Sequence, residues 1–225
     1  ENDRLYYSVA EGPVVWSVGL ATDGSFLPDP RLEIDVTGTP NNDMITGLAF
    51  DGAGRMYLTQ RGAGTGTYDY STFARPQEAS VLRFAWSEKD KAWKEAPDEY
   101  AIGVEPQHRA TNGGLALGYG LDSKGNIDPG QCRAMLWTTG EHLITEHSGT
   151  TPVHGLQGSP IGSAQTAVET QPKSGATALQ VKPGTEIAST LAAPQGVWFT
   201  DSDEAITGEN AHGYVGAIAI FSKKQ

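Results

Sequence analysis

Side chains that could hold a ligand or a metal ion recur beside a short glycine phrase in this chain. The phrase is a polar residue followed by one or two glycines and an apolar residue, and its polar positions are Thr46, Asn112, His154 and Gln195. Hydroxyl, amide and imidazole groups suit the orientation of a bound ligand, and Asn112 and His154 could also bind a metal ion. We expect a ligand site where the fold gathers these residues, with His108 on the approach to it. The alternative is that they bond only to backbone and ordered water.

Aromatic side chains offer a second kind of site. Tyr68 and Tyr70 lie in a glycine-rich stretch, and Trp93 lies close to the tip of a predicted hairpin. Clusters of exposed aromatic residues form contact surfaces. We expect Tyr68, Tyr70 and Trp93 to form an interaction surface for a protein or glycan partner.

Other groups resemble known motifs less well. Residues 141–147 hold two histidines five positions apart, which would face opposite sides of a strand. Residues 201–204 carry three carboxylates but lack the glycine of a calcium-binding loop. The glycine-rich stretch 61–70 precedes no Lys-Ser or Lys-Thr pair, so it does not match a phosphate-binding loop. Cys132, the one cysteine, excludes an internal disulfide and is expected to be buried.

The elements that must position these residues are predicted to be short strands. Apolar residues cluster or alternate with polar ones at 5–9, 14–20 and 31–36, and a tight turn at Asp51-Gly52-Ala53-Gly54 joins two further strands. The chain holds 28 Gly and 13 Pro among 225 residues, a composition that favours strands and turns over helices.

The glycine phrase also indicates the fold. Gly114, Gly155 and Gly196 follow one another at equal intervals of 41 residues, and a repeat of about 40–45 residues with several short strands is typical of a propeller blade. We expect one all-β domain over residues 1–225, a β-propeller of five blades, with six blades as the alternative. The N- and C-terminal strands, the latter at 214–221, are predicted to pair and close the ring.

Three segments are expected to interrupt the regular repeat. They are long loops at 61–80 and 121–133, and an irregular blade at 150–193, which is poor in aromatic residues. In a propeller the innermost strands begin at one mouth of a central channel. The polar residues of the glycine phrase are therefore expected to meet at that mouth.

Charge and hydropathy exclude some classes of partner. A net charge of −11 and an isoelectric point near 4.8 oppose binding to nucleic acid. No apolar run approaches the roughly 20 residues that span a bilayer, so we expect no membrane insertion. We expect a periplasmic or extracellular protein.

Two phrases resemble a known family. Residues 48–58 and 112–116 are similar to blade openings of NHL-repeat propellers and of the gluconolactonase (SMP-30) family. Members of that family hold a divalent cation at the channel mouth with Glu, Asn and Asp side chains, and hydrolyse lactones or organophosphates. The resemblance implies calcium or another divalent cation near Asn112, with Glu11 in a similar Glu-Gly-Pro phrase. Here Glu11 follows a predicted strand, and no residue matches the family's Asp.

The sequence thus leaves two functions open. The first is a non-catalytic extracytoplasmic binding or scaffolding module, part of a larger protein or assembly. The alternative is a divalent-cation-dependent lactonase or esterase of the gluconolactonase type, with its site at the channel mouth. No Gly-x-Ser-x-Gly elbow is present, which argues against a serine hydrolase of that kind.

Overall fold

The structure of the chain is a computed structural model. It describes residues 3–37, 43–62, 79–95, 102–103, 109–122, 126–141, 143, 154–161, 185–186, 198–201 and 218–219. Every regular element in these residues is a β-strand, and the strands pair antiparallel. The all-β prediction is therefore confirmed.

The strands form three main sheets. In chain order they are β1 (Arg4–Val9), β2 (Gly12–Gly19), β3 (Arg31–Asp35), β4 (Met44–Phe50), β5 (Met56–Arg61), β6 (Val81–Ser87), β7 (Ala92–Glu95), β8 (Thr111–Gly118), β9 (Gly120–Leu121), β10 (Ile127–Asp128), β11 (Met135–Gly140), β12 (Gly155–Pro160), β13 (Thr185–Glu186) and β14 (Trp198–Asp201). The first sheet is β1-β2-β3, the second is β4-β5-β6-β7, and the third is β13-β14-β12-β11-β8. Strands β9 and β10 form a separate short pair.

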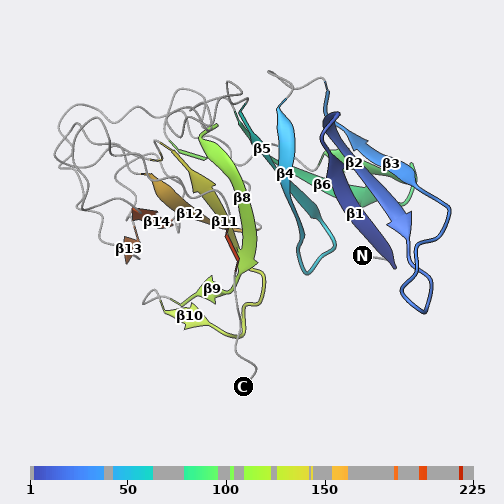
Figure 1. The fold of residues 1–225 in the computed structure, drawn as a ribbon. Coiled ribbons are helices and arrows are strands. Elements are labelled where there is room, and N and C mark those ends of the chain that lie inside the picture. The colour runs from blue at the N-terminus through green and yellow to red at the C-terminus, as the bar shows by residue number, and fades with distance from the viewer. Residues whose placement is uncertain are drawn as a thin grey trace.

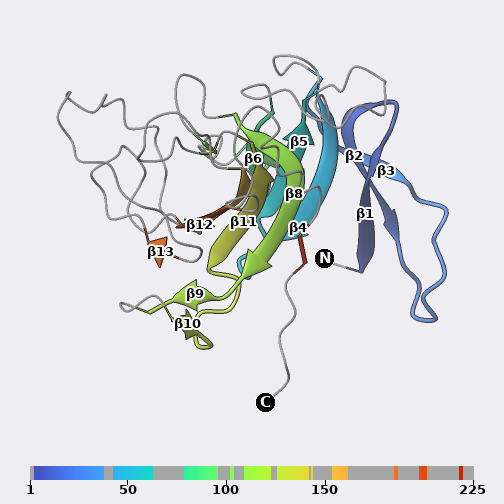
Figure 2. The same cartoon turned by 60° about the vertical axis from the view of Figure 1, so that its left-hand side comes forward.

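The three sheets stand side by side, with the second sheet in the middle (Figures 1 and 2). Strand β4 packs against β1 and β2 on one side and against β8 on the other. Strands β4 and β8, the first strands of their sheets, are therefore neighbours.

The main apolar core lies between the first and second sheets. Along β2 every second residue is buried, as a strand with one covered face requires. The buried core residues are Val15, Ile34, Val36, Ile45, Met56, Leu58, Leu82, Phe84 and Trp93. This packing fixes the first sheet against the second.

The hairpin between β4 and β5 follows its sequence prediction. Phe50 pairs with Met56 at the end of the ladder. The Asp51 carboxylate accepts hydrogen bonds from the backbone N–H groups of Ala53 (2.8 Å) and Arg55 (3.0 Å). It also accepts from Arg55 Nε (2.6 Å) and the Tyr57 hydroxyl (3.0 Å). A single buried carboxylate therefore holds the whole turn.

Two features of the predicted repeat are not reproduced. The phrase at His154 was expected to begin a new blade, but β12 pairs with β11. Strand β14, which begins three residues after Gln195, pairs with β12. Both strands therefore belong to the sheet that β8 begins, and that part of the prediction is wrong. The cause is that a period in the sequence does not say which strands pair.

The described residues form an open row of sheets. Of the segment 214–221, only Ile218 and Ala219 are described, and neither belongs to a strand. The predicted loop 121–133 contains part of the β9–β10 pair, and the predicted irregular blade 150–193 contains β12 and β13. Most of the predicted loop 61–80 lies outside the described residues.

Candidate functional site

Strands β4 and β8 begin at the same end of the second and third sheets. A parallel bridge joins Ala79, just before β6, to Ala110, just before β8. Polar side chains that are at least nine-tenths buried gather at this end. We call it the polar end and define it by Asp43, Gln60, Thr111, Asn112, Glu141 and His154.

The junction between β4 and β8 depends on one backbone carbonyl. The Gly113 oxygen accepts hydrogen bonds from Thr46 Oγ1 (3.1 Å) and Thr59 Oγ1 (2.7 Å). Gly113 has a φ of +89°, a conformation that favours glycine. Thr46, a predicted ligand residue, thus joins two sheets through its hydroxyl.

The register of the third sheet places Glu141 beside His154 and close to the start of β8. Gly140 pairs with Gly155 of β12, so the next position brings Glu141 beside His154. The Glu141 N–H donates to the Ala110 carbonyl oxygen (3.0 Å), so Glu141 also lies opposite Ala110. Residues opposite each other share a face, so Glu141 and His154 do. Asn112 is buried two residues after Ala110, at a shift of register in β8. Three chemically different polar groups are therefore buried at the same end of one sheet.

Burial leaves one atom of Asn112 and one atom of Glu141 without a hydrogen bond in the described part of the chain. The exposed fractions of Asn112, Glu141 and His154 are 3%, 5% and 0%. Neither Asn112 Nδ2 nor Glu141 Oε1 has a hydrogen-bond partner in the described part of the chain. Unbonded buried polar atoms of this kind are costly and call for a water molecule or a ligand.

The environment also changes the acidity of Glu141. Burial raises the pKa of its carboxyl group to about 7, because the charged form loses its hydration. Near neutral pH this group can therefore donate or accept a proton. Together with the imidazole of His154 and the amide of Asn112, it can bind a small polar ligand or take part in proton transfer.

The donors that the described residues supply are too few for a calcium ion. Among the described residues, no three His, Cys, Asp or Glu side chains come together as a metal site. Asn112 and Glu141 offer two oxygen-bearing side chains and His154 offers nitrogen, whereas calcium takes about six to eight oxygen ligands. By themselves, these three side chains suit a hydrogen-bonded ligand.

Several other predicted residues take different places. Trp93 was expected at an interaction surface, but its side chain is 8% exposed and belongs to the apolar core. The reason is that the apolar faces of the first and second sheets pack against each other, which removes this side chain from water. Cys132 was expected to be buried and is exposed. Glu11 is exposed between β1 and β2. Tyr68, Tyr70, His108 and Gln195 lie outside the described residues.

Glu141 is the site residue that sequence reasoning missed. It lies in the segment 141–147, whose histidine spacing matched no metal motif. A usable signal was its place directly after the apolar strand β11, where a carboxylate at a strand end can be buried. The pairing that brings it beside His154 is not visible in the sequence.

The chain was also compared with known proteins. No protein-family model, no curated protein and no solved structure matches it. Within the described residues, no helix has the length and apolar character to cross a bilayer.

Proposed function

We propose that this chain is an extracytoplasmic, non-catalytic binding or scaffolding module of the β-propeller type, and that it forms part of a larger protein or assembly. The observation that carries the binding function is the burial of Asn112, Glu141 and His154 at the polar end, where Asn112 Nδ2 and Glu141 Oε1 have no hydrogen-bond partner among the described residues. A ligand with both a donor and an acceptor would satisfy them.

The arrangement of sheets supports a propeller. Three antiparallel sheets stand in a row, with the first strands of the second and third sheets adjacent (Figures 1 and 2). The outer face of the first sheet carries exposed apolar side chains, namely Leu5 (45% exposed), Tyr7 (37%) and Leu32 (50%). In a closed ring, the neighbouring blade covers such a face. We propose five blades, closed by pairing of the first sheet with residues 214–221.

The binding function can be tested by ligand-induced stabilisation. A ligand that binds only the folded state raises its melting temperature. In a screen of small neutral polar metabolites, we expect at least one compound to raise the melting temperature of the natural protein but not that of Asn112→Ser. Asn126→Ser is the matched control, because Asn126 is exposed and its side-chain bonds are to Asp122 in the same turn. Stabilisation that survives Asn112→Ser would exclude this site.

A protein or glycan partner would use a different part of the chain. The proposed surface is the loop with Tyr68 and Tyr70, without the buried Trp93. The double substitution Tyr68→Ala and Tyr70→Ala should reduce capture of the partner while the melting temperature stays the same. Unchanged capture would remove this loop from the proposal.

A cation-dependent lactonase or esterase is the second candidate. The observation in its favour is the raised pKa of Glu141, which suits acid–base chemistry. It requires one calcium or zinc ion per chain by plasma mass spectrometry, a lower melting temperature after chelation, and lactone hydrolysis that Asn112→Ala abolishes. A metal-loaded protein that hydrolyses no lactone or ester would rule it out.

A further inference from the structure

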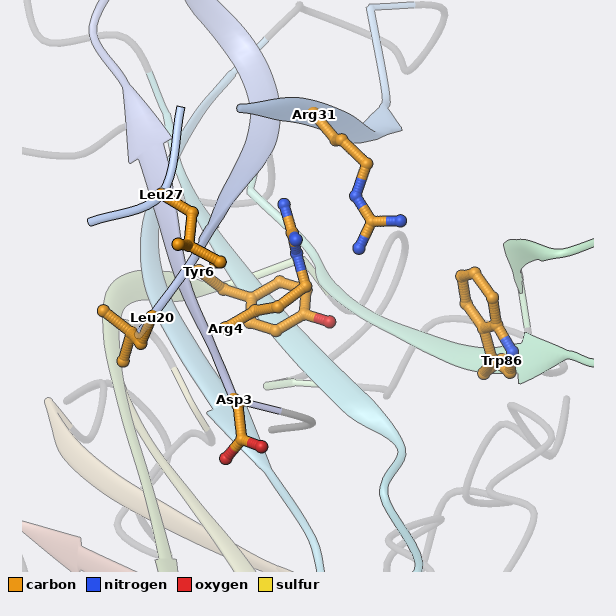
Figure 3. Close-up of a pocket in the computed structure, with 8 residues that line it drawn as sticks. Asp3, Arg4, Tyr6, Leu20, Leu27, Arg31 and Trp86 are labelled. Atoms are coloured by element: carbon orange, nitrogen blue, oxygen red, sulfur yellow. The ribbon is translucent and has the colours of Figure 1, made fainter. Parts of the chain in front are cut away.

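A pocket of about 310 Å³ lies between the first sheet and the end of β6 (Figure 3). Its lining includes Asp3, Arg4, Tyr6, Leu20, Arg31 and Trp86, none of which belongs to the polar end. The volume is at the lower end of the roughly 300–1,000 Å³ of small-molecule sites.

Aromatic stacking holds two walls of the pocket in place. The Trp86 ring packs edge-on against Trp93, with centroids 5.7 Å apart. Trp93 in turn packs edge-on against Tyr6 at 6.1 Å, and Tyr6 packs against Phe50 at 5.0 Å. Trp86 is only partly buried, so part of its ring surface remains available at the pocket.

Arg4 belongs to the framework of the pocket. Its Nη1 contacts Asp29 Oδ2 at 2.6 Å, its Nε donates to Ser17 Oγ at 2.8 Å, and its Nη2 donates to the Asp29 carbonyl oxygen at 2.9 Å. Asp29 also accepts the Gly19 N–H at 2.8 Å. Arg4 therefore ties the segment after β2 to β1.

Arg31 has hydrogen-bond donors that could bind a ligand. Its side chain is 55% exposed, and its Nε forms an ion pair with Glu33 Oε1 at 3.7 Å. Within the described residues, no hydrogen bond from its Nη1 or Nη2 is found. Figure 3 shows the Arg31 guanidinium beside the pocket, with the Tyr6 hydroxyl pointing toward the side on which Trp86 lies.

Asp3 supplies the complementary acceptor. Its backbone oxygen accepts the Leu20 N–H at 2.8 Å, and its φ is +56°. Asp3 also lines the pocket, at the end opposite Arg31, and its carboxylate points outward from that end (Figure 3). An acceptor therefore lies at the rim of the pocket, away from the Arg31 donors.

The balance of charge narrows the class of ligand. Arg4 pairs with Asp29 and Arg31 pairs with Glu33, so Asp3 leaves a small negative excess. Phosphates and carboxylates are therefore poor ligands, the more so because the whole chain carries a net charge of −11. A neutral molecule with many hydroxyl groups and an apolar ring face uses every feature of this pocket.

We propose that this pocket binds a neutral sugar unit of a glycan. The apolar face of the sugar ring lies on Trp86, Arg31 donates to its hydroxyl oxygens, and Asp3 accepts from its hydroxyl groups. This site is independent of the function proposed for the polar end.

The experiment is saturation-transfer NMR on the full chain with a panel of sugars. The panel contains cellobiose, maltose, lactose, chitobiose and mannobiose, with glucuronate and galacturonate as the charged members. We expect transfer to at least one neutral sugar. Trp86→Leu and Arg31→Ala should each raise its Kd at least about tenfold, because each removes a principal contact.

Two exposed residues on the same sheets provide matched controls. Tyr7→Ala removes an aromatic ring from β1 outside the pocket, and Lys94→Ala removes a cation that is 58% exposed on β7. Both should leave the Kd unchanged. If Trp86→Leu lowers the melting temperature, Arg31→Ala carries the test, because that side chain is more than half exposed.

Three results would each overturn the proposal. One is the absence of transfer to every neutral sugar. Another is a Kd that neither Trp86→Leu nor Arg31→Ala changes. The last is tighter binding of the uronates than of the neutral sugars, which would assign the pocket to anions.

Discussion

Glu141 and Asp51 are both buried carboxyl groups, and their surroundings change their acidity in opposite directions. Glu141 Oε1 has no hydrogen-bond partner among the described residues, and burial raises its pKa. For Asp51 burial also acts to raise the pKa, but hydrogen bonds from Arg55, Tyr57 and Ala53 outweigh it and the pKa is lowered. The number of donors therefore decides which carboxyl group stays charged.

Glu141 should make the protein less stable as the pH rises through its folded pKa. Its pKa is about 7 in the folded state and 4.5 in the reference state. Between these values the unfolded chain loses a proton that the folded chain keeps, so rising pH favours unfolding by about 3 kcal/mol in total. Glu141→Gln should therefore be more stable than the natural protein at pH 7.5 and similar to it at pH 4, as measured by urea denaturation.

The exposed Glu95→Gln on β7 is the control for this experiment and should show no such pH dependence. An equal effect of Glu141→Gln at both pH values would contradict the assigned acidity. A loss of stability at pH 7.5 would show that the charged carboxylate has a partner, such as a bound cation.

Asp51 should have the opposite pH dependence. Its lowered folded pKa means that its contribution is present above the unfolded value near 3.8 and is lost as the pH falls through the folded value. Asp51→Asn should lower the free energy of unfolding by about 2 kcal/mol at pH 7, because charged hydrogen bonds are lost. Denaturation curves from pH 7 to pH 2 should show this difference shrinking at the acidic end, and a constant difference would count against it.

At the scale of elements, the contact between β4 and β8 sets how the second and third sheets meet. Gly47 lies where a Cβ atom would overlap Thr59 Oγ1 and stand 2.9 Å from Leu115 Cβ. Glycine is required at position 47 because neighbouring strands approach it closely, and this requirement does not depend on its backbone conformation.

Gly47→Ala should lower the free energy of unfolding by about 1–3 kcal/mol, because the added methyl group must push the two sheets apart. Gly52→Ala is the matched control, since nothing lies within 4 Å of a Cβ at that turn. It should change stability by less than about 0.5 kcal/mol. Thermal and urea unfolding of both variants would measure the difference, and equal values would refute the tight junction.

At the scale of the whole molecule, the first sheet ends the row with an apolar outer face. Leu5 and Leu32 are about half exposed there. In the proposed ring, the rest of the protein covers them.

The double substitution Leu5→Lys and Leu32→Lys tests this closure. If the ring is closed, two buried charges should lower the free energy of unfolding by at least about 2 kcal/mol. Ile127→Lys is the control, because Ile127 is 69% exposed on β10. Chemical denaturation measures the free energy of unfolding of both variants. If the two values agree within about 0.5 kcal/mol, the outer face of the first sheet is open to solvent.

Local sequence was sufficient for the strands and the turns. Alternating apolar residues predicted β1, β2 and β3, and Asp51-Gly52-Ala53-Gly54 predicted the hairpin, because strand faces and tight turns depend on residues near one another in the chain. The residue types at Asn112 and His154 also marked them as candidate ligands before their positions were known.

Pairing between distant strands decided the rest. The sequence period suggested that His154 begins a separate blade, whereas the tertiary structure places it beside Glu141 in the sheet that contains Asn112. It also buries Trp93 between two sheets and brings Trp86 near Arg31 to form a pocket. These contacts join residues far apart in the chain. Which long-range contacts form depends on how the sheets pack together, and a local sequence pattern does not determine that packing.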